Sequence, residues 1–397
     1  MTPPRGRSAE AAEIQRWLMD VPHVADGGAG FMRALAGRLV AAGLPVWRIS
    51  YALQTMHPEV LWRTVRWEQG DAVTLVDQPY ARLLDPFYTQ SPVARLREGA
   101  GVVRVRLVDG PLPYSICEEL RARGGTDYCA YGLQFASGPV TYIAYATRSE
   151  AGFDEEDLAV FAAIVPFLAR RIELESAYYA TRALLDVYLG RNAARRVLAG
   201  EFQRGRGELI DAAIWYSDMR GFTALSERCT PTQLIETLDA TFDAVASAVA
   251  VHGGEVLKFI GDAVLAIFPV GEDPGDACRR GLAAADEAFA ALARLNHARA
   301  PEDALAIGVA LHRGQVMYGN IGARERLDFT VISSAVNEAT RLEALCKQLA
   351  TPLALSEVFV TTAGLTGLED LGAHALKGVR APLRVFTRRS PGHGESG

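Results

Sequence analysis

Residues 253–268 read GGEVLKFIGDAVLAIF, two apolar runs that meet at Gly261 and Asp262. A short polar turn that contains glycine between two apolar runs is typical of a β-hairpin, so Asp262 is expected at its tip. A second aspartate, Asp218, ends the apolar run in the stretch WYSDMRGFT at 215–223. The pattern therefore places both carboxylates at the rim of a sheet. Two such carboxylates can hold two divalent ions a few Å apart, and Mg²⁺ prefers carboxylate oxygens.

The chain around these aspartates alternates between strand-like and helix-like patterns from Gly207 onward. Thr230 is the expected N-cap of a helix that begins with Pro231. The pattern predicts strands at 210–216, 305–311, 316–318, 329–332 and 353–355, a hairpin at 255–268, and helices at 231–251, 277–299 and 335–349. This arrangement predicts an α/β (α+β) sandwich of the ferredoxin-like, split βαβ kind.

The N-terminal half has a different pattern. Residues 1–30 are expected to be a polar lead-in that ends in a glycine-rich loop, and a helix is predicted at 31–42. Strands of an antiparallel sheet are predicted at 46–53, 61–67, 101–107, 133–135 and 140–146, followed by a helix from the acidic run 154–157 to about 179. The pattern resembles a GAF-type sensor domain over residues 31–169. That resemblance implies an unknown small molecule or other signal as the partner of this region.

Two features of this region leave alternatives open. Cys129 is either a buried core thiol or a ligand-binding group. Trp47, Trp62 and Trp67 either fill the core of the sheet or line an aromatic pocket.

Residues 170–207 are expected to be a helical coupling linker. They carry a broken helical stripe of Leu, Val and Tyr among many arginines: Arg170, Arg171, Arg182, Arg191, Arg195, Arg196, Arg204 and Arg206. Two interpretations remain open. The segment is either a solvated connector helix or a two-stranded element that passes a signal between domains.

Composition limits the classes of function. The chain has 397 residues and a net charge of −6, which gives no reason to expect a nucleic-acid surface. Its 5 cysteines are dispersed without a CxxC pair, which argues for a reducing compartment and against a zinc site. Residues 1–16 lack an apolar signal-peptide core, and the longest apolar run, 158–169, is too short to span a bilayer. We therefore expect a cytoplasmic protein with neither nucleic acid nor membrane as a partner.

Six motifs follow one another along the C-terminal half. They are SDMRGFT (217–223), KFIGD (258–262), GQVMYGNIG (314–322), DFTVI (328–332), VNEATRLE (336–343) and LKG (376–378). In this order they resemble the catalytic domain of class III nucleotidyl cyclases, which form cyclic AMP or cyclic GMP. The resemblance implies a catalytic domain at 208–390, and the preceding segment 188–207 is similar to the lead-in of bacterial cyclases with GAF-like sensors.

The resemblance assigns the metal site. It implies two Mg²⁺ or Mn²⁺ ions per active site, bound by the carboxylates of Asp218 and Asp262 and the backbone carbonyl of Met219. In this family one metal lowers the pKa of the ribose 3′-hydroxyl, which attacks the α-phosphate in line, and the other holds the triphosphate and the leaving pyrophosphate. The amides of Phe222 and Thr223 are expected to face phosphate. An isolated strand-end aspartate would instead be interpreted as a turn or helix cap.

Three further residues are expected at the ribose and the phosphates. Asn337 and Arg341 are four residues apart on a predicted helix, so they share one face. The resemblance implies that Asn337 orients the ribose and that Arg341 neutralises charge at the reacting phosphate. Lys377 is similar to the lysine that binds the terminal phosphates. The alternatives are a solvated Arg341 paired with Glu338 or Glu343, and an exposed turn lysine.

The base is expected to be read by Lys258 and Thr330. A lysine can donate a hydrogen bond to N1 of adenine, and a threonine hydroxyl can accept one from the 6-amino group. Guanylyl cyclases resemble one another in having Glu and Cys at these positions, so this pair predicts ATP as the substrate. The alternative is a solvent-facing strand lysine and a threonine present for its β propensity.

The chain departs from the family pattern in two places. Residues 333–335 are Ser-Ser-Ala where the family often has Gly-Asp-Thr, and Met219 replaces the commoner Ile. The metal, base and phosphate positions are intact, so activity is expected. Because of the departure at 333–335, the sequence does not predict the loop geometry near Thr330. The rate of the reaction and its selectivity for the base are therefore not predicted either.

The resulting hypothesis is a cytoplasmic adenylate cyclase, a lyase of the cyclic AMP signal-transduction type, regulated by a GAF-like sensor. In this family the metal aspartates come from one subunit and the base- and ribose-binding residues from the other, which implies a head-to-tail homodimer with two active sites. The alternatives are a guanylate cyclase and a catalytically degenerate signalling or dimerisation module. The signal, the sign of its effect and the choice between Mg²⁺ and Mn²⁺ are not predicted.

Overall fold

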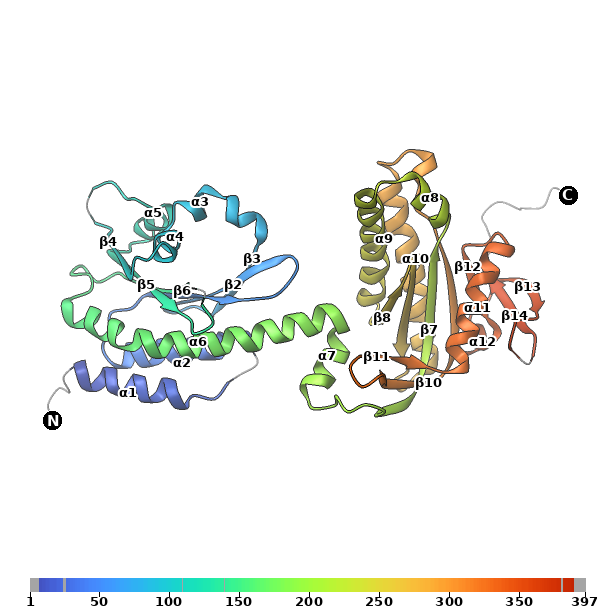
Figure 1. Ribbon diagram of the computed structural model, residues 1–397, viewed down its shortest axis with the longest axis horizontal. Coiled ribbons are helices and arrows are strands. Elements are labelled where there is room, and N and C mark those ends of the chain that lie inside the picture. The colour runs from blue at the N-terminus through green and yellow to red at the C-terminus, as the bar shows by residue number, and fades with distance from the viewer. Residues whose placement is uncertain (1–6, 24–25, 109, 139, 380, 389–397) are drawn as a thin grey trace. The chain divides into compact units, whose positions relative to one another are not determined.

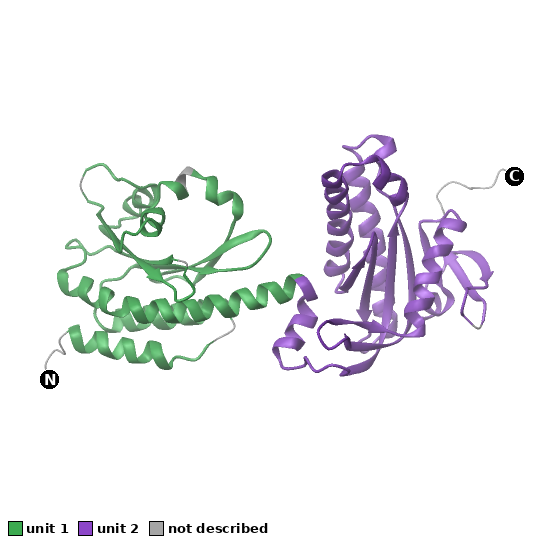
Figure 2. Cartoon of the chain, viewed as in Figure 1, with its two compact units in different colours: residues 1–187 green, residues 188–397 purple. Residues whose placement is uncertain are grey.

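The computed structural model describes residues 7–23, 26–108, 110–138, 140–379 and 381–388. The chain forms two compact units (Figure 2), an N-terminal unit of residues 1–187 and a C-terminal unit of residues 188–397. Within the described ranges, no helix combines the length and apolar character that crossing a membrane requires.

The N-terminal unit is built on an antiparallel sheet in the order β3-β2-β1-β6-β5-β4 (Figure 1). Its strands are β1 (Arg48–Gln54), β2 (Val60–Glu68), β3 (Thr74–Pro79), β4 (Val102–Arg106), β5 (Asp127–Gln134) and β6 (Val140–Thr147). Strands overlap all five ranges expected from the sequence, but β5 begins at Asp127, six residues before the predicted range 133–135. The edge strand β3 was not predicted, because its side chains are mostly exposed and show no apolar alternation.

Helices cover both faces of this sheet. One face packs against α1 (Arg7–Asp20), α2 (Ala29–Ala41) and α6 (Glu155–Leu189), whose apolar side chains share one core with β1, β2, β5 and β6. The other face packs against α4 (Pro92–Arg97) and α5 (Ser115–Ala122), while η1 (Tyr80–Leu84) and α3 (Pro86–Thr89) connect β3 to α4. Cys129 is fully buried in the first core, as expected of a core thiol.

The expectation of a polar lead-in is wrong for residues 7–20, whereas residues 26–28 form a turn in the expected glycine-rich loop. Residues 7–20 form α1, which buries Ala11, Ile14 and Leu18 in the core. These three residues lie on one helical face, but charged neighbours and small alanines weaken the apolar periodicity. Tertiary packing therefore stabilises a helix that the sequence pattern alone did not indicate.

The C-terminal unit is built on an eight-stranded sheet. Its order is β13-β14-β12-β10-β7-β9-β8, and β11 pairs with β10. The strands are β7 (Gly207–Met219), β8 (Glu255–Ile260), β9 (Ala263–Pro269), β10 (Ile307–Gly322), β11 (Leu327–Ile332), β12 (Leu353–Ser356), β13 (Glu369–His374) and β14 (Leu383–Thr387). Only β10 and β12 pair in parallel among the strand pairs of the described residues. The unit is a mixed α/β fold with β7 between β9 and β10.

The predicted strands at 305–311 and 316–318 are one long strand, β10. Residues 312–315, which separate the two predicted ranges, continue the pairing with β7. A Cβ atom at Gly314 would lie 2.5 Å from Cβ of Ala335. Glycine is therefore required there for the close approach of a helix and does not mark a turn.

Helices flank this sheet on both faces. They are α7 (Arg191–Leu198), α8 (Phe222–Arg228), α9 (Pro231–Val251), α10 (Pro274–Asn296), α11 (Ser334–Gln348) and α12 (Glu357–Ala363), with a short η2 (Pro301–Asp303). Helices α9 and α10 share one core with the central strands, and α7 and α11 pack on a second apolar cluster. Thr230 caps α9 as predicted, since its hydroxyl accepts a hydrogen bond from the Gln233 amide at 3.3 Å.

The expected linker is helical almost throughout. Helix α6 continues to Leu189, ten residues beyond the predicted end, and Gly190, with a φ of 82°, separates it from α7. Helix α7 is not a solvated connector, because Ala193 and Ala194 are fully buried and Val197 packs against the sheet of the C-terminal unit. The two-stranded form of the coupling element stays a prediction.

Candidate active site

Asp218 and Asp262 lie next to each other at the rim of the C-terminal sheet. Asp218 is the next-to-last residue of β7 and pairs in register with Ala263 at the start of β9. Asp262 precedes Ala263 in the two-residue turn between β8 and β9, whose first residue, Gly261, has a φ of 64°. The hairpin turn thus brings the second carboxylate beside the first, as the sequence pattern indicated.

The electrostatics of this pair favour a cation. Burial, together with the hydrogen bond and the charge of the Asp262 carboxylate, raises the pKa of Asp218 to about 6. Two carboxylates in contact repel each other when both are ionised, and a divalent cation between them removes that cost. No cluster of three or more His, Cys, Asp or Glu side chains suited to a metal lies within the described ranges. The side-chain donors available here are therefore these two carboxylates.

The segment after Asp218 turns sharply. Met219 ends β7 opposite Ile307, and Gly221 has a φ of 73°, in the left-handed region that favours glycine. Helix α8 begins at Phe222, whose ring packs on the core, while Thr223 is exposed. These are the residues whose amides were expected to face phosphate.

An ion pair beside the aspartates was missed by the sequence analysis. Nη1 of Arg220 lies 3.2 Å from Oε1 of Glu343 on α11, and the Glu343 side chain is only 7% exposed. Burial raises the pKa of Glu343 to about 7; Arg220 opposes the shift, and the two aspartates add to it. Both residues belong to the quoted motifs, but nothing local in either motif indicates the other as its partner.

Helix α11 presents Asn337 and Arg341 on one exposed face. The opposite face buries Ala335, Ala339 and Leu342 against the sheet. The glutamates proposed as alternative partners of Arg341 have other partners. Glu343 pairs with Arg220, and Glu338 lies 3.3 Å from Nε2 of His312.

The departure at 333–335 has a structural explanation. The Ser333 hydroxyl accepts a hydrogen bond from the Val336 amide at 3.2 Å and caps α11. Ala335 is buried against Gly314 of β10, where a larger side chain would collide with the strand. The substituted loop therefore starts the helix that carries Asn337 and Arg341 in an ordinary way.

The expected base-reading residues come from β8 and β11. Nζ of Lys258 forms an ion pair with the Asp328 carboxylate of β11, and this hydrogen bond lowers the pKa of Asp328. Thr330 follows Asp328 by two residues on the same strand, so both side chains lie on one face. The structure thus brings Lys258 to the strand that carries Thr330, and it adds Asp328, which the sequence analysis did not single out.

Lys377 is exposed in a turn near β14. The Val379 amide donates to the Leu376 carbonyl at 3.0 Å, and Gly378 has a φ of 82°. Lys377 lies apart from the other predicted site residues. Those residues form three local groups, which are the pair of aspartates, the strands that carry Lys258 and Thr330, and the exposed face of α11.

Comparison with known proteins finds similarity to nucleotide cyclases. The family described as the adenylate and guanylate cyclase catalytic domain matches residues 208–383. An adenylate cyclase of Anabaena cylindrica is 33% identical over 153 residues, which are 37% of this chain and 30% of that protein. Residues 208–383 are therefore similar to the catalytic domain shared by adenylate and guanylate cyclases. The chain spans about a third of the length of the curated relatives it matches.

Solved structures of both kinds of cyclase are similar to part of this chain. A bacterial light-regulated adenylyl cyclase is 31% identical, covers 46% of this chain and 91% of its own, and has a TM-score of 0.39. The guanylyl cyclase Cya2 is 26% identical, covers 47% of this chain and 97% of its own, and has a TM-score of 0.40.

Proposed function

We propose that this protein is an adenylate cyclase that converts ATP to 3′,5′-cyclic AMP and pyrophosphate. The observation that carries the proposal is the contact between Asp218 and Asp262, which has the donor chemistry of a phosphoryl-transfer metal site. Both residues lie inside the segment that matches the cyclase family. The ordered N-terminus of α11 and the intact arginine argue against a degenerate module.

The residues present fit hard divalent cations. The Asp218 and Asp262 carboxylates and the backbone carbonyl of Met219 would hold two Mg²⁺ or Mn²⁺ ions. When bound, such ions activate the ribose 3′-hydroxyl and stabilise charge on the triphosphate. Half-buried carboxylates side by side, with the pKa of one raised to about 6, are a donor set that a hard cation stabilises.

The remaining residues position the nucleotide. Asn337 would orient the ribose, and the guanidinium of Arg341 would neutralise charge at the α-phosphate as the 3′-oxygen attacks. Their shared exposed face on α11 permits both contacts from one helix. The amides of Phe222 and Thr223 and the ammonium group of Lys377 would contact phosphate oxygens.

ATP is the proposed nucleotide because of Lys258 and Thr330. The ammonium group of Lys258 would donate to N1 of adenine, and the Thr330 hydroxyl would accept from the 6-amino group. The ion pair with Asp328 holds Lys258 at the strand that carries Thr330. GTP stays the competing substrate.

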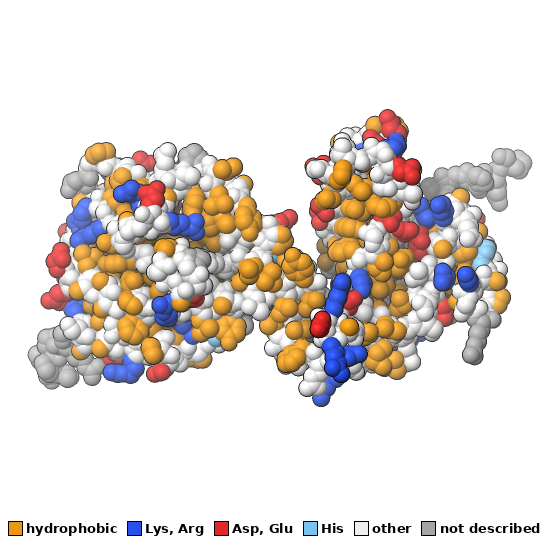
Figure 3. Space-filling model, in the orientation of Figure 1, with side chains coloured by type: hydrophobic (Ala, Val, Ile, Leu, Met, Phe, Trp, Pro, Cys, Tyr) orange, Lys and Arg blue, Asp and Glu red, His pale blue; other side chains and the backbone are white. Residues whose placement is uncertain are grey.

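A head-to-tail homodimer is the proposed active form. Leu209, Met317 and Ile332 are 61%, 44% and 55% exposed and are cross-strand neighbours on β7, β10 and β11. Direct cross-strand neighbours project to the same face, so they form one apolar stripe. Apolar side chains also gather elsewhere on the face of this unit that Figure 3 presents. A second copy of the chain would cover this stripe and contribute the other half of each active site.

The N-terminal unit is proposed to be a GAF-like sensor that acts through α6 and α7. In the C-terminal unit, Arg196 of α7 lies over the rings of Tyr318 and Phe329, with its guanidinium carbon 5.2 Å and 5.8 Å from their centroids. Asn192 of α7 donates to Glu255 of β8 at 3.2 Å. Helix α7 therefore contacts β8 and β11, the strands that carry Lys258 and Thr330. A shift of α7 would therefore move β8 and β11 and change the positions of Lys258 and Thr330.

Incubation of the full chain with ATP or GTP and Mg²⁺ or Mn²⁺, followed by mass identification of the product, tests the function. We expect cyclic AMP to be the main product and its formation to require the metal. Asp262→Asn should remove nearly all turnover without changing the melting temperature. Asp286→Asn, which alters an acidic residue of α10 outside the site, serves as the control. Cyclic GMP as the main product would reject the substrate, and turnover by folded Asp262→Asn would reject the metal assignment.

A further inference from the structure

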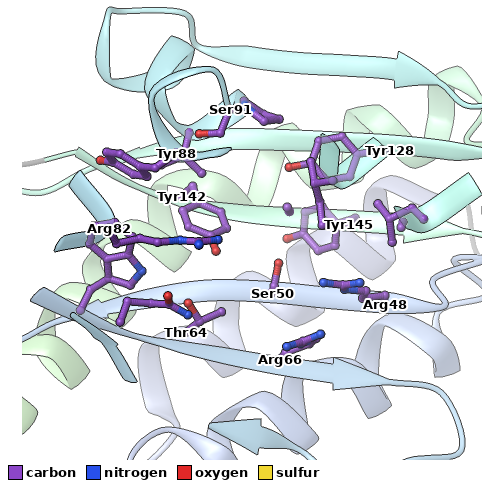
Figure 4. A pocket seen from close by; sticks show the side chains of 18 residues that line it. Arg48, Ser50, Thr64, Arg66, Arg82, Tyr88, Ser91, Tyr128, Tyr142 and Tyr145 are labelled. Carbon is purple, nitrogen blue, oxygen red and sulfur yellow. The ribbon is translucent and has the colours of Figure 1, made fainter. Parts of the chain in front are cut away.

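The N-terminal unit contains a cavity on the sheet face that packs against α4 and α5. Its volume is about 180 Å³ (Figure 4). The floor is recessed because Ser50, Ala144 and Ala146 are small and occupy neighbouring positions on β1 and β6. Larger side chains, Trp62, Tyr128 and Tyr142 among them, line the cavity from the surrounding strands. The cavity therefore exists because the pairing of β1 with β6 brings these small residues together on one face of the sheet.

The described residues that line this cavity include three arginines and no carboxylate. Two of the arginines have close partners outside the lining. Arg48 lies 2.8 Å from Glu119, and Arg82 lies 2.5 Å from Asp85.

Arg66 has the weakest ion pair of the three. Its nearest carboxylate is Glu68 at 4.0 Å, and both oxygens of Glu68 already accept hydrogen bonds from Arg123. Nε of Arg66 is buried without a hydrogen-bond partner, although 28% of the side chain remains exposed. A buried donor without a partner is costly, and a guanidinium binds a planar carboxylate with two parallel hydrogen bonds. Arg66 therefore provides one positive charge for an anionic group in the cavity.

The rest of the lining fits an aromatic ring. Trp62 and Tyr88 lie with their ring centroids 4.9 Å apart, and the hydroxyls of Ser50, Thr64 and Tyr142 supply hydrogen-bonding groups. A cavity of roughly 150 Å³ accommodates benzene, so 180 Å³ accommodates one ring. A second cavity of about 180 Å³ shares Trp62, Val93 and Tyr142 with the first.

We propose that the N-terminal unit binds a small aromatic carboxylate in this cavity. Arg66 binds the carboxylate, and Trp62 and Tyr142 contact the ring. The single available positive charge selects a monoanion over a phosphate dianion. This site is separate from the cyclase chemistry, so its test uses binding and not turnover.

Isothermal titration calorimetry of the full chain tests this site with benzoate, 4-hydroxybenzoate, benzamide, inorganic phosphate and cyclic AMP as probes. We expect at least one of the two carboxylates to bind, and neutral benzamide to bind at least tenfold more weakly than benzoate. Arg66→Gln should weaken carboxylate binding at least tenfold. Arg95→Gln, which alters an exposed arginine of α4, should leave it unchanged. Ser50→Val, which fills the floor and keeps Arg66, is the second test and should also abolish binding.

Several results would overturn the proposal. They are no heat from either carboxylate at millimolar concentration, equal affinity for benzamide and benzoate, and binding of phosphate or cyclic AMP in place of carboxylates. Unchanged carboxylate binding in folded Arg66→Gln or Ser50→Val would do the same. If Arg66→Gln does not fold, the Ser50→Val and benzamide results decide.

Discussion

Arg220 and Glu343 form an ion pair, 3.2 Å between Nη1 and Oε1, that joins the segment after Asp218 to the helix carrying Asn337 and Arg341. Glu343→Gln leaves the Arg220 guanidinium half-buried without its charged partner, and Arg220→Met leaves a buried carboxylate near the two aspartates. Breaking such a pair costs roughly 3 kcal/mol of unfolding free energy. Since the pair fixes the residues around the site, kcat should also fall by roughly tenfold, equivalent to about 1.4 kcal/mol.

A double-mutant cycle tests this coupling. The double variant Arg220→Met/Glu343→Leu should lose less stability in urea unfolding than the sum of the two single variants, because no charge is left unpaired. Glu287→Gln, which breaks an exposed ion pair with Arg294 on α10, should change neither stability nor kcat. Additive losses would show that Arg220 and Glu343 act independently.

Base selection is the second prediction. Lys258→Glu with Thr330→Cys should shift preference from ATP toward GTP, because both changes invert the hydrogen bonding at the base edge. Each unmatched group costs roughly 1–3 kcal/mol, so the ratio of kcat/KM values for ATP and GTP should fall by about a hundredfold. The introduced glutamate would face Asp328, so Asp328→Asn in addition should restore part of the rate.

The ratio of the two kcat/KM values is the measurement, since the variants will be slow. Lys347→Gln, which alters an exposed lysine in the last turn of α11, is the control and should leave the ratio unchanged. An ATP:GTP ratio in the double variant equal to that of the parent would show that Lys258 and Thr330 do not read the base.

Subunit complementation tests the shared active site. Asp218→Ala and Arg341→Ala chains should each be nearly inactive alone. Mixed heterodimers should regain up to about half of the parent rate, because one of their two sites collects both changes and the other is intact. Activity per heterodimer, with heterodimers counted by differently tagged chains, is the measurement. Proven heterodimers without activity would mean that each site is built within one chain.

The docked helix α7 gives a prediction about substrate binding. Arg196 lies 2.7 Å from both Glu201 and Glu208 and over the rings of Tyr318 and Phe329. Arg196→Ala should loosen α7 from β10 and β11 and raise the KM for ATP several-fold, because β11 carries Thr330. Its neighbour Arg195 is exposed and donates a hydrogen bond to Asn192 of the same helix, so Arg195→Ala is the matched control. Equal KM values in the two variants would contradict a role of α7 at the base-reading strands.

Much of the fold follows from local patterns. Helix α9 begins and ends at the predicted residues. The N-cap Thr230, with Pro231 after it, and the helical periodicity of the apolar residues both indicated these boundaries. The hairpin around Asp262 was predictable for the same reason, and with it the approach of Asp262 to Asp218. Edge strand β13, like β3, was not predictable, since its exposed side chains give no alternation and its partner strand orders it.

Contacts between distant segments were the part that sequence could not supply. The ion pairs Lys258–Asp328 and Arg220–Glu343 join segments far apart in the chain, and no local periodicity marks either partner. The continuity of β10 through Gly314 was not predicted, because the approach of Ala335 that requires glycine there is a tertiary contact. The burial of α1 was also not predictable, because the core against which it packs is formed by α2, α6 and the N-terminal sheet.

His312 connects β10 to two neighbouring elements. Its Nδ1 lies 2.8 Å from the Ser356 hydroxyl, and its Nε2 lies 3.3 Å from the Glu338 carboxylate of α11. Burial lowers the pKa of His312 from 6.5 to about 4, since the ring is almost completely inaccessible to water. The carboxylate of Glu338 favours the charged imidazole, but its own side chain is 25% exposed and desolvation of the ring dominates.

The last prediction is the pH dependence that follows. Between pH 4 and 6.5 the unfolded chain binds a proton at His312 that the folded chain does not. His312 alone therefore lowers the free energy of unfolding by up to about 3 kcal/mol as pH falls through this window, whereas the raised pKa values of Asp218 and Glu343 act in the opposite direction. Hydrogen exchange of β10 amides, corrected for the intrinsic rate at each pH, measures this loss within the C-terminal unit. His312→Gln should remove this contribution, so its free energy of unfolding should rise relative to that of the parent as pH falls from 6.5 to 4, whereas His297→Gln, at an exposed position, should follow the parent. A pH dependence of the free energy of unfolding that is the same in His312→Gln as in the parent would show that His312 does not titrate on unfolding.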